Sequence, residues 1–303
     1  MIETTFHTMS SAMRWRSMAG GLLATIILSG LNSPALAQVR EDDRPKITEE
    51  TPFVRSPAVV VDTMLKMAGV RATDFLIDLG SGDGRIVINA AKEYGARGFG
   101  VDYDPRLVAF ATENARKEGV DDRIKFIQQD LFKTELGSAT VITMYLLEEY
   151  NMALRPRLFA LKPGTRIVSH DWHLGDWEAD AKVKIPVPDK PVGLEKASWI
   201  YLWVVPAKVG GAWNSQVPTD NGWVNVELKF VQHFQKISGE ATVSGKKIPI
   251  ERASLSGDFL SFRIQIGTQT VLFKGQVQSG RITGQVMQSG GRNLRWRALR
   301  MQS

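Results

Sequence analysis

The chain of 303 residues contains no cysteine and only four histidines. The absence of cysteine excludes disulfide bonds, thiolate nucleophiles and cysteine-ligated metal sites, but it leaves the cellular compartment open. Long apolar runs are also missing, because the one near the N-terminus is well short of the roughly 20 residues that span a bilayer. The apolar content of 43 % is ordinary for a globular protein. The length allows two domains and a processed end.

The short apolar run lies between basic residues and a small-residue motif. Arg14 and Arg16 precede the run at 18–31, and Ala-Leu-Ala37 follows it. A positive start, a short apolar core and an Ala-x-Ala end are typical of a secretory signal peptide. We therefore expect residues 1–37 to be a signal peptide cleaved after Ala37 and the protein to be exported to the periplasm, an uncleaved membrane anchor being the alternative. Residues 38–50 are polar and charged, which predicts a loose lead-in.

The most informative stretch joins an apolar run to a glycine-rich turn. Residues 75–77 (Phe-Leu-Ile) are typical of a fully buried strand in a parallel sheet. Gly80, Gly82 and Gly84 follow, where a tight turn and close approach to a ligand exclude any Cβ. Residues 85–94 have helical composition and end before a glycine. Strand, glycine turn and helix form the unit that binds nucleotides at the carboxyl end of a strand.

Three acids at strand ends distinguish this loop from a dinucleotide-binding loop. The glycine spacing is G-x-G-x-G rather than G-x-G-x-x-G, and Asp78 stands two residues before Gly80. A carboxylate at that position would repel a pyrophosphate but would attract the amino group and sulfonium-bearing tail of S-adenosylmethionine (SAM). Asp102 ends a second expected strand, where a ribose is usually held. Asp130 ends a third and could meet the adenine amino group.

These strands with their acids resemble the class I SAM-dependent methyltransferases. The segments 51–70, 78–88, 129–132 and 141–147 are similar to the ATP synthase c-subunit lysine N-methyltransferases and their bacterial relatives, and 169–177 resembles the bacterial branch. The resemblance covers about residues 51–206. It implies a Rossmann-like α/β sheet, SAM as methyl donor and a protein lysine as acceptor. The cofactor-binding residues that it implies are Asp78, Gly80, Ser81, Gly82, Gly84, Asp102 and Asp130.

Candidate catalytic residues follow the fourth and fifth expected strands, because ligands of open α/β sheets lie beyond the strand carboxyl ends. Tyr145, Glu149 and Asp171 could hold a lysine amine and favour loss of its proton, whose pKa is about 10.4 in the free side chain. Packing is the alternative for Tyr145, and a first-turn helix carboxylate is the alternative for Glu149. Side chains alternate along a strand, so His170 and Asp171 should point apart unless the strand has already ended, and we expect no metal site.

The pattern of apolar and polar residues changes after about residue 206. Before it, strand-like and helical segments alternate, which predicts a parallel sheet with an antiparallel hairpin, 182–187 and 198–205, at one edge. After it, short alternating runs separated by Ser-Gly turns predict a C-terminal antiparallel all-β domain at 210–303. From Pro206 onward there are 13 Lys+Arg and 5 Asp+Glu, a net charge of +8 that outweighs the −2 of the preceding residues and makes the whole chain +6.

Two interpretations of the basic domain remain open. Arg295, Arg297 and Arg300 are either a solvated strand face or a surface that contacts an acidic partner or a membrane. Aromatic residues are not interleaved with the basic ones, so we do not expect a nucleic-acid partner. The function hypotheses are a SAM-dependent methyltransferase of a protein lysine, one of a small molecule or lipid, and an exported SAM-fold binding protein without turnover. The oligomeric state is left open.

Overall fold

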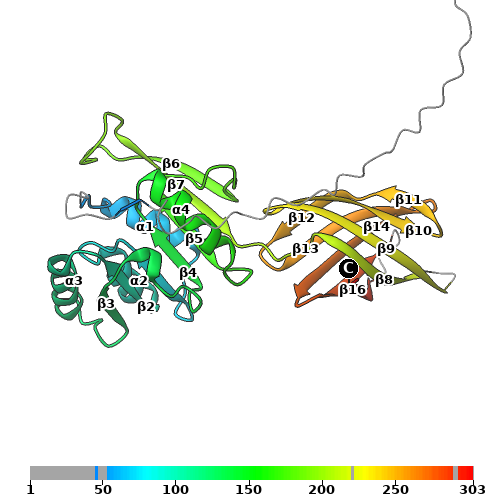
Figure 1. The fold of residues 1–303 in the computed structure, drawn as a ribbon, viewed down its shortest axis with the longest axis horizontal. Coiled ribbons are helices and arrows are strands. Elements are labelled where there is room, and N and C mark those ends of the chain that lie inside the picture. Colours follow the sequence, from blue (N-terminus) through cyan, green and yellow to red (C-terminus); the bar gives the residue numbers. More distant parts are fainter. Residues whose placement is uncertain (1–44, 47–52, 220–221, 289–292, 303) are drawn as a thin grey trace, which may run out of the picture. The chain divides into compact units, whose positions relative to one another are not determined.

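The computed structural model describes residues 45–46, 53–219, 222–288 and 293–302 (Figure 1). The expected signal peptide and most of the expected lead-in therefore lie outside the described residues. Within the described part of the chain, no helix is long and apolar enough to cross a membrane.

The first half of the chain forms a seven-stranded sheet with the predicted topology. Its strands are β1 (Phe75–Leu79), β2 (Arg97–Asp102), β3 (Ile124–Gln128), β4 (Val141–Met144), β5 (Arg166–His170), β6 (Ala181–Pro186) and β7 (Ala197–Val204). The spatial order is β3-β2-β1-β4-β5-β7-β6. Strands β1 to β5 are parallel, and β7 pairs antiparallel with both β5 and β6. The predicted α/β fold class with an edge hairpin is confirmed.

Four helices accompany this sheet: α1 (Ala58–Ala68), α2 (Arg85–Tyr94), α3 (Pro105–Lys117) and α4 (Glu148–Phe159). Their ends follow local sequence signals. Helix α2 starts after Gly84 and ends before Gly95, and both glycines have left-handed backbone conformations that other residues adopt rarely. Helix α3 has Pro105 in its first turn, and Asp104 caps it by accepting a hydrogen bond from the Arg106 N–H. Glycine turns and caps therefore fix where these helices begin and end.

One hydrophobic core joins α1, α2 and α3 to the sheet. Val60 and Met64 of α1 are fully buried with Leu76 of β1 and Val168 of β5. Strand β1 is buried on both faces, because Ile77 and Leu79 are also fully buried. Truncating Ile77 to alanine would cost about 2–5 kcal/mol of unfolding free energy. The packing thus holds the carboxyl end of β1 rigidly in the middle of the sheet.

The second sheet is antiparallel and has nine strands. They are β8 (Gly211–Thr219), β9 (Gly222–His233), β10 (Lys236–Val243), β11 (Lys246–Pro249), β12 (Glu251–Ser256), β13 (Phe259–Ile266), β14 (Gln269–Gln278), β15 (Arg281–Met287) and β16 (Asn293–Arg300). Their order is β11-β10-β9-β8-β16-β15-β14-β13-β12. The predicted C-terminal all-β fold is confirmed.

Aromatic side chains fill the inner face of the second sheet. Phe262 and Phe273 stack with ring centroids 4.7 Å apart, and Trp296 meets both rings edge-on. All three are buried, as is Trp213. Alternate residues along each strand point to the opposite, solvated face. The alternation of apolar and polar residues in the sequence therefore corresponds to the inner and outer faces of this sheet.

Phe234, in the turn between β9 and β10, packs on aromatic residues of the first half of the chain. Its ring stacks on Trp177 with centroids 5.6 Å apart and lies edge-on to Phe159 of α4. Phe234 and Trp177 are both buried. Trp177 lies in the loop between β5 and β6, so the β9–β10 turn buttresses a loop that follows a strand end.

Candidate active site

The glycine loop follows β1 and is attached to the end of β2. Gly80, Gly82 and Gly84 have φ angles of 75°, 54° and 82°, a region that other residues adopt with strain. Space excludes side chains as well: a Cβ on Gly82 would lie 2.1 Å from Cε2 of Phe53. The N–H groups of Gly80 and Ser81 donate to the Val101 carbonyl at 3.0 and 2.9 Å. The loop is thus a fixed cradle in which backbone can approach a ligand.

Asp102, at the end of β2, holds the same loop. Its Oδ2 accepts a hydrogen bond from the Gly82 N–H at 2.8 Å, and its Oδ1 accepts one from the Asp104 N–H at 3.1 Å. A carboxylate has about four acceptor positions, so two remain for a ribose hydroxyl pair. The predicted ribose contact is compatible with this arrangement.

Asp78 is a buried carboxyl group at the edge of the cradle. It is 1 % exposed, and its Oδ1 accepts a hydrogen bond of 2.7 Å from the Thr143 hydroxyl. Burial raises the pKa of Asp78 to about 7, and the nearby charges of Asp102 and Asp83 add to this effect although the Thr143 bond opposes it. A cationic ligand would relieve this excess of negative charge. The site therefore favours a ligand with a positively charged end.

Ser81 contributes a polar group that the cradle itself does not satisfy. Its hydroxyl is buried and has no hydrogen-bond partner among the described residues. Buried hydroxyls are nearly always paired, so this atom indicates a place for a polar ligand group. The glycine cradle, the acidic Asp78 and the Ser81 hydroxyl together fit SAM, which has a cationic amino acid tail and an adenosine part.

The segment 53–56 crosses the cradle and closes a cavity of about 30 Å³. Arg85 pairs with Asp83 at 2.6 Å and donates to the Ser56 carbonyl at 2.8 Å. The Ser56 hydroxyl lies 3.0 Å from Nδ1 of His170. Besides this segment, the cavity is lined by Asp78, Gly80, Ser81, Asp83, Arg85, Ile86 and Tyr145. It connects the cofactor residues to the candidate catalytic tyrosine.

Asp130 lies two residues beyond β3, which ends at Gln128 rather than at Asp130. Its side chain accepts a hydrogen bond from the Phe132 N–H at 2.8 Å and so caps a short 3₁₀ turn at Leu131–Lys133. Because β1, β2 and β3 are parallel, Asp78 near the end of β1, Asp102 at the end of β2 and Asp130 after β3 all lie at the same edge of the sheet. The adenine contact of Asp130 stays a prediction.

Tyr145 follows β4 and stacks on His170 at the end of β5, with ring centroids 3.8 Å apart. His170 is fully buried between the hydroxyls of Ser56 and Ser198, at 3.0 and 2.9 Å. Burial lowers the pKa of His170 to about 4, so the ring is neutral at pH 7. Burial, together with the charge of Asp171, raises the pKa of Tyr145 to about 12. Tyr145 therefore presents a neutral hydroxyl at neutral pH.

A left-handed backbone conformation at Asp171 directs its side chain toward His170. Strand β5 ends at His170, and Asp171 has a φ of 61°, which brings its Oδ2 to 3.4 Å from Nε2 of His170. Strand β5 has already ended at His170, which is the condition under which these side chains were not expected to point apart. The Asp171 carboxylate pairs with Lys190 at 2.8 Å and accepts from the Trp199 N–H at 2.9 Å. It anchors the β6–β7 hairpin.

The candidate Glu149 is exposed in the first turn of α4, and its neighbour Glu148 has an oxygen 3.6 Å from Nε2 of His173. A catalytic role for Glu149 stays a prediction. Sequence reasoning missed His170, Ser56 and Lys190 as site residues. The only signal for His170 was its place at a strand end.

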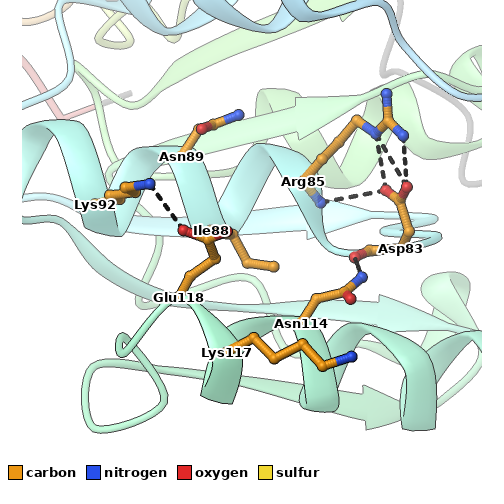
Figure 2. A pocket seen from close by; sticks show the side chains of 8 residues that line it. All are labelled: Asp83, Arg85, Ile88, Asn89, Lys92, Asn114, Lys117 and Glu118. Atoms are coloured by element: carbon orange, nitrogen blue, oxygen red, sulfur yellow. Dashed lines mark hydrogen bonds and ion pairs between the residues drawn. The ribbon is translucent and has the colours of Figure 1, made fainter.

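A larger cavity, of about 270 Å³, lies between α2 and α3 (Figure 2). Its side chains are largely paired with one another: Lys92 with Glu118 at 2.8 Å, and Asn114 with the Asp83 carbonyl at 3.0 Å. It is lined mainly by helix surfaces, whereas the smaller cavity is lined at the strand ends by Asp78 and Tyr145, whose pKa values burial raises to about 7 and about 12. The smaller cavity is therefore the candidate active site. Within the described residues, no group of three His, Asp or Glu side chains is arranged to hold a metal ion.

Parts of the chain are similar in sequence to known proteins. The family model described as the ANTKMT methyltransferase domain matches residues 78–181. A protein-lysine N-methyltransferase from Saccharolobus islandicus is 39 % identical over 136 residues, which are 44 % of this chain and 84 % of that protein. The ATP synthase c-subunit lysine N-methyltransferase of Rattus norvegicus is 31 % identical over 164 residues, 53 % of this chain and 70 % of that protein.

A solved structure of an RNA methyltransferase from Salinibacter ruber with S-adenosylhomocysteine is 48 % identical; the match covers 52 % of this chain and 96 % of that chain, with a TM-score of 0.46. The fold, the site and the two relatives above define a SAM-dependent methyltransferase. The chain belongs to the family of the protein-lysine and ATP synthase c-subunit lysine N-methyltransferases. The resemblance seen in the sequence is thereby confirmed.

Proposed function

We propose that this enzyme methylates the side-chain amine of a lysine in a protein substrate. The observation that carries the methyl-transfer part is the buried Asp78 beside the glycine cradle, which favours a cationic cofactor. The lysine part is supported by relatives that are named lysine N-methyltransferases, at 39 % and 31 % identity. A protein acceptor is therefore favoured over a small molecule or lipid.

SAM supplies a methyl group that is already activated by the sulfonium, so the residues of the chain mainly bind, orient and exclude water. Asp78, Gly80, Ser81, Gly82, Gly84, Asp102 and Asp130 would hold it. Ser81 offers a buried hydroxyl, and the turn at Gly82 lets the backbone come close. The segment 53–56, tied to Arg85, lines the same cavity as the cradle.

Tyr145 would position the lysine amine rather than take its proton. With its pKa at about 12, the Tyr145 hydroxyl is neutral at neutral pH. A neutral hydroxyl can accept a hydrogen bond from the amine and hold its lone pair toward the methyl group. The stacked His170 ring fixes the tyrosine ring in place. The lysine therefore loses its proton to solvent, and its free-amine fraction increases with pH.

The test is transfer of tritium from labelled SAM into fractions of the native host. We expect label in protein, mapped to methyl-lysine by mass spectrometry, and none with the Asp78→Asn variant. Label found solely in lipid or small molecules would exclude the lysine acceptor. Tight SAM binding without any transfer would support a binding protein without turnover.

We also propose that the protein acts outside the cytoplasm. Arg14, Arg16, the apolar run at 18–31 and the Ala-Leu-Ala37 motif support this. Mass spectrometry of the protein from its native host should find Gln38 as its first residue. A cytoplasmic protein that retains residues 1–37 would overturn the proposal.

A further inference from the structure

The outer face of the second sheet carries a group of basic side chains. Lys274 on β14, Arg281 on β15, and Arg295 and Arg297 on β16 are exposed, and Arg263 on β13 is half-buried. None of the five takes part in an ion pair within the part of the chain that the structure describes. These five residues are called the basic face below.

Strand register brings the basic face together. Gln285 of β15 pairs with Lys274 on one side and with Arg295 on the other. Arg297 follows two residues after Arg295 and pairs with Thr283. Directly paired residues point to the same face, neighbouring strands lie about 4.8 Å apart, and residues two apart along a strand lie about 7 Å apart. The charges are thus separated by roughly one Debye length of about 8 Å, so that their potentials add.

Few acidic side chains lie near the cations of the basic face. The residues in the paired rows beside the cations of β14 and β16 are neutral, namely Gln285 and Thr283, whereas Glu251 of β12 is paired with Arg263 at the edge of the basic face. Asp258, in the turn before β13, accepts a hydrogen bond from the Gln276 side chain at 2.7 Å. Glu227 of β9 lies two strands beyond β16, opposite Asn214. A broad, net positive surface therefore faces solvent.

We propose that the basic face docks on the headgroups of an anionic phospholipid bilayer. Its charge is complementary to such a surface, to which each nearby Lys or Arg adds roughly fivefold in affinity. Two apolar side chains share the same solvated side of the sheet: Leu299, 49 % exposed and paired with Arg281, and Trp223, 68 % exposed on β9. Tryptophan suits the boundary between headgroups and acyl chains, because one part of its ring is apolar and its N–H is polar.

A single-stranded nucleic acid fits this face less well. Such a ligand stacks its bases on aromatic rings set between the cations. Here the side chains between the cations are amides and hydroxyls. Trp223 lies on β9, two strands from β16, and the exposed Phe259 of β13 lies beyond Gln276 at the end of a row, not between two cations. The bilayer proposal is independent of the methyl acceptor, because it concerns the second sheet alone.

The test is co-sedimentation of the full chain with vesicles of phosphatidylcholine, with or without phosphatidylglycerol. We expect binding only to vesicles that contain phosphatidylglycerol, weakened by added salt. The triple variant K274Q/R295Q/R297Q should bind on the order of a hundredfold more weakly. The matched control K229Q/K246Q/K247Q removes the same charge from β9 and β11 and should bind within about threefold of the parent chain, since it leaves the basic face intact.

Thermal unfolding should be nearly the same in both triple variants, because all six side chains are exposed and the one ion pair that is lost, between Lys247 and Glu240, lies at the surface. SAM affinity should also be the same, because all six residues lie on strands of the second sheet. Equal loss of vesicle binding in the two variants would show a net-charge effect and overturn the proposal. Absence of any preference for phosphatidylglycerol would overturn it as well. Tighter binding to a single-stranded RNA oligomer than to the vesicles would replace the bilayer by a nucleic acid.

Discussion

Tyr145 and His170 stack face to face at the carboxyl ends of two neighbouring parallel strands, with ring centroids 3.8 Å apart. His170 is held by Ser56, whose backbone carbonyl is held by Arg85 at the start of α2. The segment that covers the cofactor cradle and the tyrosine at the acceptor side are therefore connected through one histidine. This connection allows the roles of the cradle and the tyrosine to be tested separately.

Asp78 should make SAM binding depend on pH. Its folded-state pKa is raised to about 7, so below pH 7 the group is protonated and cannot attract the cationic ligand. SAM affinity should therefore increase about tenfold from pH 6 to pH 8 and level off above. Calorimetry at these pH values is the measurement. The Asp78→Asn variant should bind weakly without this pH dependence, whereas exposed Asp122→Asn should behave like the parent. A flat profile in the parent would contradict the assignment.

The same group affects stability in the opposite direction. The folded state of a carboxyl group with a raised pKa binds more protons than the unfolded state. Between about pH 4 and pH 7 the unfolding free energy of the ligand-free protein should therefore decrease with rising pH, by up to about 4 kcal/mol from Asp78 alone. Urea denaturation of the parent and of Asp78→Asn should show that the difference between their unfolding free energies changes steadily between pH 4 and pH 7. A constant difference would exclude a raised pKa.

His170 should lower stability in acid. Its pKa is reduced to about 4 from an ordinary 6.5, so below pH 6.5 the unfolded state takes up a proton that the folded state does not. The unfolding free energy should therefore decrease by about 3 kcal/mol as the pH falls from 6.5 to 4. Denaturation of His170→Gln between pH 7 and pH 4 should lack this part of the slope. Exposed His173→Gln is the control and should retain it.

Removing the Tyr145 hydroxyl should reduce turnover but leave SAM affinity nearly unchanged. Loss of one hydrogen bond to the amine costs about 1–1.5 kcal/mol, or roughly tenfold in kcat. Activity should still increase with pH in Tyr145→Phe with the same apparent pKa, because the titrating group is the lysine and not Tyr145 at about 12. Tyr94→Phe, at the end of α2, is the control. Disappearance of the pH dependence would make Tyr145 the base.

Loss of the Phe234 ring should destabilise the loop between β5 and β6. Phe234 is 7 % exposed and stacks on buried Trp177, so Phe234→Ala should cost about 3–5 kcal/mol of unfolding free energy. Phe259→Ala, whose side chain is 49 % exposed, should cost much less. Chemical denaturation compares the two. Equal effects would show that the aromatic contact contributes little to stability.

Much of the first half of the molecule could be predicted because local signals and the global fold agree. Gly84 and Gly95 bound α2 on both sides, and the helix occupies the predicted residues Arg85–Tyr94. The edge hairpin of β6 and β7 follows the predicted ranges within one residue. Strand β3 is shorter than predicted, because Asp130 caps a 3₁₀ turn instead of ending the strand.

The sequence by itself determined the elements, the glycine cradle and the acids at the carboxyl ends of the first three strands. Turn conformation and the period of burial are local properties of the chain, and the alternation of strands and helices indicates a parallel sheet. Only the tertiary structure decided that His170 joins Ser56 to Tyr145, that Asp171 binds Lys190, and that the five cations of the basic face lie together. These relations depend on side chains brought together across strands and on one left-handed residue at the end of β5. Spacing along the chain does not carry that information, since contact distance and burial exist only once the chain has folded.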